Sequence, residues 1–214
     1  QAAFDCYVER FGESENHVCK DIHEITTKEI DKIPNHTLLV GGFPCQGFSV
    51  ANTGRHEDDE RNKLYLEMIR VINDKRPPYF LAENVKGILS LGKGQVFQNI
   101  ISDFRSLGYE VQYQLLNAAD YGVPQIRYRV IIVGIRDDLH QRYIYPSPTH
   151  AKDESMFLKR WVSVSEALKN LPDPDSPNNI DNHVYSKYKL NLNGYLGHRT
   201  IDPDKPAPTV TARG

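Results

Sequence analysis

The sequence has few cysteines and no long apolar run, and both shortages narrow the class of protein. Its three cysteines, Cys6, Cys19 and Cys45, are an odd number without paired spacing, which argues against a disulfide framework and favours a reducing compartment. No CxxC, HExxH or similar ligand spacing occurs, so we expect no metal site. No segment has the length of a membrane span or the pattern of a signal peptide, so we expect a cytoplasmic protein that makes no use of a membrane.

The sequence also has no strong excess of positive or negative charge. The formal net charge is −2, so no overall basic field attracts a nucleic acid, and any such partner must be held by local patches. With 214 residues, 39% of them hydrophobic, the chain can form one domain with a substantial core and a smaller appendage.

At both ends, the sequence starts or stops inside a segment with helix or strand periodicity. The sequence begins at Gln1 without a methionine, yet Ala3, Tyr7 and Phe11 already stand at helical spacing. The other end stops within a strand-like alternation, PAPTVTARG. We therefore expect a fragment, or one half of a split protein.

Apolar patterns with strand and helix periods alternate along the first two thirds of the chain. The predicted strands are residues 36–40, 79–82, 109–118 and 128–136, and the predicted helices are residues 61–75 and 94–109. Strands that alternate with helices of this length predict βαβ units, and therefore an α/β fold with a mostly parallel sheet.

The character of the sequence changes near residue 146. Prolines cluster there, regular periodicity fades, and only one short helix is predicted, at 163–171, opened by a capping box of Ser163 and Glu166. We predict an α/β core over 1–146 and the start of a second, irregular region over 147–214.

Reactive side chains stand near the predicted ends of the strands, where an open α/β sheet binds its ligands. Cys45 follows the first strand in a turn, a setting that can favour the nucleophilic thiolate. Glu83 follows the second strand, where a carboxyl group can act as an acid. Arg127 and Arg129 alternate into the last strand and form a fork suited to a carbonyl oxygen, a carboxylate or a phosphate.

Each of these residues also has an ordinary interpretation. A lone cysteine is more often a small buried hydrophobe, an isolated glutamate is more often a surface charge, and arginines at a sheet edge discourage aggregation. Their combination is what favours a reactive site.

Three segments together resemble a known family. GGFPCQGFS (41–49), AENVKG (82–87) and YGVPQIRYRV (121–130), in this order and spacing, are similar to the catalytic blocks of the cytosine-C5 DNA methyltransferases of the bacterial modification type. The resemblance is most specific over residues 1–150. It implies a Rossmann-like methyltransferase sheet with helices on both faces, here lacking its first strand and glycine-rich loop, followed by an incomplete target-recognition region.

The resemblance also implies roles for the reactive residues. The Cys45 thiolate would add to C6 of a cytosine flipped out of double-stranded DNA, so that C5 can take a methyl group. Glu83 would protonate N3, and Arg129 together with Arg127 would hold O2 and orient Glu83. Asn84 is expected to shape the turn rather than to react.

The implied cofactor is S-adenosyl-L-methionine. The segments CKDIHEI (19–25) and RNKLYLE (61–67) resemble further blocks of the family, and the residues expected to meet the cofactor are Asp21, Ile22, Phe43, Pro44 and Leu64. The family's glycine-rich block and ribose-binding acid precede Gln1, so we expect weak cofactor binding unless a complementary chain supplies them.

A polar loop from Gln46 to about Arg61 is expected to close over the DNA. The residues expected to contact DNA are Gln46, Ser49, Arg55, His56 and Gln125. A role within a restriction–modification system follows from the resemblance to modification enzymes.

Other hypotheses remain open at this stage. The chain could be a catalytically incomplete fragment or a split subunit that serves as a DNA-binding partner. A thiol hydrolase would need a histidine beside Cys45, and no Cys/His pattern stands out. An RNA substrate occurs in the wider family, but the Pro-Cys-Gln block is typical of the DNA type.

Overall fold

The computed structural model describes residues 2–15, 17–44, 64–173, 176, 178–180, 183 and 201–209. Cys45 and the predicted closing loop, with Gln46, Ser49, Arg55 and His56, lie outside the described residues.

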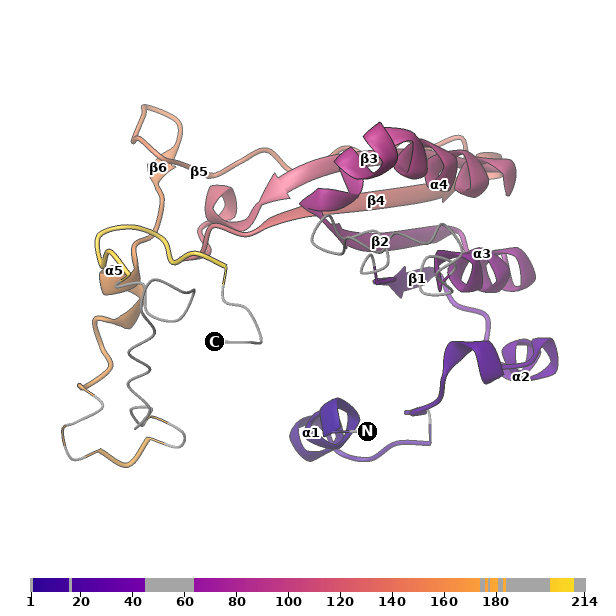
Figure 1. Ribbon diagram of the computed structural model, residues 1–214, viewed down its shortest axis with the longest axis horizontal. Coiled ribbons are helices and arrows are strands. Elements are labelled where there is room, and N and C mark those ends of the chain that lie inside the picture. The colour runs from indigo at the N-terminus through magenta and orange to yellow at the C-terminus, as the bar shows by residue number, and fades with distance from the viewer. Residues whose placement is uncertain are drawn as a thin grey trace. The chain divides into compact units, whose positions relative to one another are not determined.

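The chain divides into two compact units. The first unit comprises residues 1–113 and 131–143, and the second comprises 114–130 and 144–214. The elements that lie wholly in the first unit are α1 (Ala2–Phe11), η1 (Ile22–Glu24), α2 (Thr27–Lys32), β1 (Leu38–Gly41), α3 (Leu64–Lys75), β2 (Tyr79–Val85), η4 (Lys86–Gly94), α4 (Gln95–Ser106) and η6 (Asp137–Leu139) (Figure 1). The second unit holds η5 (Ala118–Tyr121), β5 (His150–Ala151), β6 (Lys159–Arg160) and α5 (Val164–Leu168). The strands β3 (Tyr109–Asn117) and β4 (Tyr128–Arg136) run from one unit into the other.

The four predicted strands form one sheet with the order β1-β2-β4-β3 (Figure 1). Strands β1 and β2 are parallel, with Leu38 opposite Tyr79 and Gly41 opposite Ala82. The α/β prediction is therefore confirmed, and the predicted bounds of β4 agree with the structure. The second strand is longer than predicted, since β2 continues to Val85 and includes Glu83.

Aromatic rings form the centre of the core in the first unit. The ring of Phe80 on β2 lies 4.8 Å from that of Phe104 on α4 and 5.3 Å from that of Tyr109 on β3, measured between centroids. The buried hydroxyl of Tyr109 donates to the carbonyl of Pro77 at 2.6 Å, and burial raises the pKa of Tyr109. Gly134 on β4 leaves the space that the Phe80 ring occupies.

The predicted apolar stripe of α4 is confirmed. Five apolar residues stand at helical spacing in this segment, and four of them, Phe97, Ile100, Ile101 and Phe104, are buried, while the fifth, Val96, is half-buried. The helix is shorter than the predicted 94–109 and ends at Ser106, because Gly108 adopts φ +79 in the C′ position, a conformation that costs glycine no strain.

The short helix near residue 165 is a correction to the prediction of 163–171. Ser163 caps it, since its Oγ accepts a hydrogen bond from the Glu166 amide at 3.2 Å, but α5 ends at Leu168. Pro172 disfavours a helical conformation for the residue before it, which explains why the helix does not reach Leu171.

No helix within the described ranges is long and apolar enough to cross a membrane. Cys6 and Cys19 are both exposed and carry free thiols.

Gly134 provides the first prediction. A Cβ at this position would lie 1.9 Å from the Phe80 ring, so Gly134→Ala should lower the free energy of unfolding by about 1–3 kcal/mol through overpacking. Urea unfolding measures the difference. Gly87→Ala is the control, because a Cβ there meets nothing within 4 Å, and an equal loss in both variants would contradict the prediction.

Glu29 provides a second prediction. Its carboxylate accepts from Lys20 Nζ at 2.8 Å and from Thr26 in a capping box, and the hydrogen bond from Lys20 is the main reason that its pKa falls from 4.5 to about 2. Because the folded pKa lies below the unfolded one, this contribution to stability is complete above pH 4.5 and is lost as the pH falls towards 2.

A carbon-detected NMR titration of the Glu29 carboxyl group should show this low midpoint. In Lys20→Met the midpoint should rise towards 4.5, whereas in Lys28→Met, which removes the same charge from the helix itself, it should stay low. An unchanged midpoint in Lys20→Met would refute the assignment.

Candidate functional site

The turn after β1 leads directly to Cys45, and a buried amide holds it. The side chain of Asn84, which is 3% exposed, donates from Nδ2 to the carbonyl of Phe43 at 3.0 Å. Its Oδ1 accepts from the amide of Val85 at 2.9 Å. The expectation that Asn84 shapes the turn is therefore confirmed, and the strand ends of β1 and β2 are fastened together.

Glu83 faces the opposite side of β2 from Asn84. Burial alternates along this strand, with Phe80, Ala82 and Asn84 buried and Glu83 half-buried. A Cβ on Gly42 would lie 3.5 Å from Oε2 of Glu83, so the carboxylate lies against the turn three residues before Cys45.

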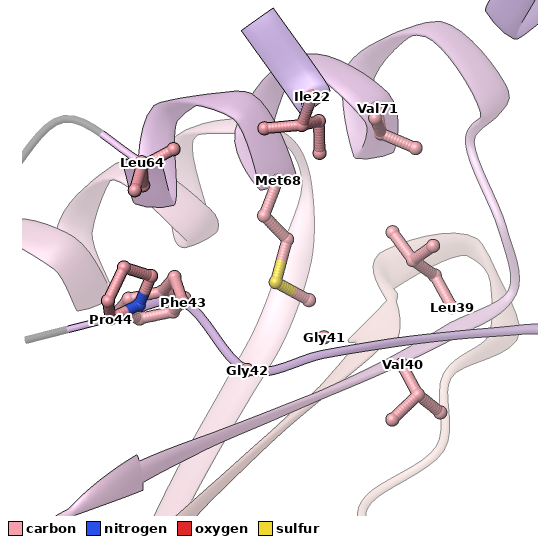
Figure 2. A pocket seen from close by; sticks show the side chains of 10 residues that line it. All are labelled: Ile22, Leu39, Val40, Gly41, Gly42, Phe43, Pro44, Leu64, Met68 and Val71. Atoms are coloured by element: carbon pink, nitrogen blue, oxygen red, sulfur yellow. The ribbon is translucent and has the colours of Figure 1, made fainter. Parts of the chain in front are cut away.

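An apolar pocket of about 170 Å³, open to solvent, lies beside the same turn (Figure 2). Its lining consists of Ile22, Leu39, Val40, Gly41, Gly42, Phe43, Pro44, Leu64, Met68 and Val71. Four of the five residues predicted to bind the cofactor line it: Ile22, Phe43, Pro44 and Leu64. The fifth, Asp21, is not among the lining residues, and its carboxylate caps η1 by accepting from the His23 amide at 3.0 Å.

Charged side chains of α3 hold Ile22 over this pocket. Arg70 donates from Nη2 to the carbonyl of Ile22 at 3.0 Å and is itself bound by Glu67 at 2.6 Å. The other carboxylate oxygen of Glu67 lies 3.3 Å from Nδ1 of His23. The η1 turn is thereby anchored to the helix, an interaction that the sequence pattern did not reveal.

Met68 forms part of the pocket wall. Its side chain extends from α3 towards Gly41 and Gly42 (Figure 2), and a Cβ on Gly41 would lie 3.1 Å from its sulfur. In the sequence, Met68 and Val71 stand with Leu64 and Ile72 on one apolar face of the predicted helix 61–75, a pattern that indicates a core position and not a pocket. Their spacing relative to Leu64 was the signal that could have assigned them to the pocket as well.

Tyr65 connects the start of α3 to α4. Its hydroxyl donates to Oδ2 of Asp103 at 2.9 Å, and burial together with this bond raises the pKa of Tyr65 to about 12. The ring of Phe43 lies 6.1 Å from that of Tyr65, so the turn after β1 packs against a helix that is itself braced.

The arginines and Gln125 belong to the second unit. Arg129 lies on β4, where its Nη1 donates to the carbonyl of Tyr128 at 2.8 Å, and Arg127 directly precedes the strand. Gln125 forms a parallel bridge with Ala207.

The segment around Ala207 pairs with the loop that carries Gln125. The amide of Ile126 donates to the carbonyl of Ala207 at 2.8 Å, and the amide of Ala207 donates to the carbonyl of Pro124 at 2.9 Å. The Thr209 hydroxyl donates to Ile126 at 2.8 Å. Residues separated by about eighty positions thus support this loop.

Within the described part of the chain, no three His, Cys, Asp or Glu side chains are grouped so that they could hold a metal ion.

The fold and the pocket define an α/β protein with a ligand-sized hollow beside the end of β1, and comparison with solved structures narrows this class to methyltransferases. A crystal structure described as that of a DNA modification methyltransferase encoded within an E. coli prophage matches with a TM-score of 0.62 and 29% identity, over 81% of this chain and 47% of the other. The family profile described as C-5 cytosine-specific DNA methylase matches residues 1–210, so the chain belongs to this family. The resemblance drawn from the three sequence blocks is confirmed.

Curated relatives agree with this assignment. The chain is 51% identical over 156 residues to Type II methyltransferase M.BspRI of Lysinibacillus sphaericus, covering 73% of this chain and 36% of the relative. It is 41% identical to Type II methyltransferase M.NgoFVII of Neisseria gonorrhoeae, covering 91% of this chain and 57% of the relative. The chain thus spans between about a third and somewhat over half of these relatives' length.

Asn84 provides a prediction for this site. Asn84→Leu keeps the approximate volume but leaves the Phe43 carbonyl without its donor, which should lower the free energy of unfolding by about 1–3 kcal/mol. Urea unfolding tests this. Asn99→Leu, at an exposed position on α4, should cost far less, and equal losses would contradict the assigned role.

Proposed function

We propose that the protein containing this chain is a DNA (cytosine-5-)-methyltransferase that transfers a methyl group from S-adenosyl-L-methionine to a cytosine in double-stranded DNA. The observation that carries the proposal is the arrangement around one turn. The residues leading to Cys45 lie against the Glu83 carboxylate and also line an apolar pocket. A nucleophile, an acid and a cofactor would thus meet at one place.

Cys45 is the proposed nucleophile. Cytosine C5 reacts poorly with electrophiles, because the ring is aromatic. Addition of the Cys45 thiolate to C6 turns C5 into an enamine-like carbon that can take a methyl group. After transfer, loss of the C5 proton expels the thiolate and restores the ring. The target base must leave the duplex for this step, at a cost of a few kcal/mol.

Glu83 and the arginines support that addition. As the thiolate adds, electrons move towards N3, and Glu83 supplies the proton that N3 needs. Arg129 and Arg127 hold O2 and orient Glu83. The residues proposed to contact DNA are Gln46, Ser49, Arg55, His56 and Gln125.

The pocket suits the cofactor in chemistry. Ile22, Phe43, Pro44 and Leu64 offer apolar surfaces for a flat purine, and Asp21 on the adjacent turn is proposed as its polar partner. When bound, S-adenosyl-L-methionine supplies an electrophilic methyl group on sulfonium.

The roles proposed for the two regions of the chain follow the change in sequence pattern near residue 146. Residues 1–146 form the catalytic core and residues 147–214 begin the target-recognition region. A complementary chain could supply further parts of the cofactor site. We place the protein in the bacterial cytoplasm, within a restriction–modification system.

Covalent trapping tests the proposed function. DNA carrying 5-fluorocytosine cannot release the enzyme, because fluorine replaces the proton that must leave C5. In the presence of S-adenosyl-L-methionine, whose methyl group must reach C5 before the adduct becomes irreversible, the whole protein containing this chain should form a denaturation-resistant adduct, with Cys45 identified by peptide mass spectrometry, and Cys45→Ser should form none. Absence of an adduct in the wild type would favour a non-catalytic DNA-binding subunit, and an adduct that persists in Cys45→Ser would refute the mechanism.

The pocket assignment has its own test. Val71→Trp places a large ring in the pocket and should weaken binding of S-adenosyl-L-methionine at least about tenfold in isothermal titration. Leu66→Trp on the same helix, at an exposed position outside the lining, is the matched control. Equal affinities in both variants would place the cofactor elsewhere.

A further inference from the structure

A buried amide at the end of β3 holds the backbone of Arg127. Asn117 is 4% exposed, and its Oδ1 accepts from the Arg127 amide at 3.2 Å and from the Ala119 amide at 3.4 Å. The Ala118 amide donates to the Arg127 carbonyl at 3.0 Å. Both backbone polar groups of Arg127 are therefore bound at the junction of β3 and η5, two residues before Arg129 on β4.

Asp120 extends this connection. Its Oδ1 accepts from Nδ2 of Asn117 at 3.4 Å and from the indole Nε1 of Trp161 at 2.9 Å. The Asp120 carbonyl accepts from the Thr149 amide at 2.9 Å. A single carboxylate oxygen of Asp120 thus joins Asn117 to Trp161, which lies 41 positions after Asp120.

The turn that contains Gly122, between Asp120 and Arg127, has little room to move. Gly122 has φ +86, and a Cβ there would lie 2.8 Å from Cε1 of His150. The tryptophan is held as well, because its amide donates to the Ala151 carbonyl at 2.8 Å. The series of hydrogen bonds that runs from Trp161 through Asp120 and Asn117 to Arg127 is therefore held at both ends by backbone contacts.

We propose that Asn117 is a positioning residue for the Arg127–Arg129 pair, and that Trp161, through Asp120, holds Asn117 in the orientation that this requires. The inference rests on the proposed function, since it concerns the arginines assigned to the cytosine ring. The direction of an arginine side chain depends on the position of its backbone. A hydrogen bond that fixes the Arg127 amide therefore also fixes the point from which the first side chain of the Arg127–Arg129 pair extends. The amide of Asn117 can point its oxygen at Arg127 only while its nitrogen faces an acceptor, and Asp120 is that acceptor.

The hydrogen-bonded path makes a prediction that is independent of catalysis. In Asn117→Ala the Arg127 amide should exchange with solvent about a hundredfold faster, because its acceptor is gone. Residue-resolved NMR exchange measures this. Tyr109→Phe is the matched control, since it removes one buried hydrogen bond from the first unit, and it should leave the Arg127 amide protected.

Trp161 supplies a spectroscopic signal, because it is the one tryptophan in the sequence. Its emission should shift in Asp120→Leu, which removes the acceptor, and to a smaller extent in Asn117→Ala, which removes one of the two donors to Oδ1 of Asp120. Asp120→Asn keeps an acceptor oxygen and should emit like the wild type, as should Tyr109→Phe. Unchanged emission in Asp120→Leu would overturn the role of Trp161.

Trapping kinetics test the positioning itself in the whole protein. At saturating 5-fluorocytosine DNA, Asn117→Ala should form the adduct at least about tenfold more slowly. Its DNA dissociation constant should stay within about threefold, because the phosphate contacts are unchanged. Asp120→Asn should restore most of the rate that Asp120→Leu loses. Should Asn117→Ala fail to fold, Asn117→Ser, with a shorter acceptor, takes its place.

Adduct formation by Asn117→Ala at the wild-type rate would refute the positioning role and leave the proposed function intact. So would an equal slowing in Tyr109→Phe, which would mark a loss of stability alone. A wild-type protein that forms no adduct would instead refute the proposed function, and with it the catalytic importance of Asn117.

Discussion

One hydrogen bond, from the buried side chain of Asn84 to the carbonyl of Phe43, holds the site together. It joins the ends of two parallel strands at the point where the chain turns towards Cys45. A buried amide without a hydrogen-bond partner is costly, so the Asn84 side chain favours a turn whose Phe43 carbonyl lies within its reach. Glu83 is the next residue towards the start of β2, and the alternation of the strand turns its carboxylate to the other side, against Gly42.

The pocket depends on the same turn and on α3. The helix contributes apolar side chains to the wall, and its charged residues Glu67 and Arg70 bind the η1 turn that carries Ile22. Glycine at position 41 leaves room for the Met68 side chain, and the Glu83 carboxylate lies beside glycine at position 42. Membership of the C-5 cytosine-specific DNA methylase family gives this arrangement its chemical meaning.

The second unit has the same kind of support, in which a buried asparagine amide holds the backbone of a loop. Asn117 holds the backbone of Arg127 as Asn84 holds that of Phe43. In both cases an asparagine is used because one side chain offers a donor and an acceptor at once, so it can bind a backbone group and satisfy its own remaining atom. The arginine loop receives further support from the Ala207 segment through backbone pairing.

Much of the fold could be read from the sequence, because its signals are local. The bounds of β4, the apolar stripe of α4 and the glycine that ends α4 all follow from periodicity and backbone preference over a few residues. The three blocks around Cys45, Glu83 and Arg129 likewise sufficed to identify the family.

The tertiary structure alone decided which distant residues support that site. The bond from Arg70 to Ile22 joins residues 48 positions apart, and that from Trp161 to Asp120 joins residues 41 positions apart. Even the length of β2 was decided by its neighbours in the sheet, since the polar pair Glu83–Asn84 does not favour a strand by propensity. Such contacts depend on how folded elements approach one another, and no pattern within a single segment encodes that geometry.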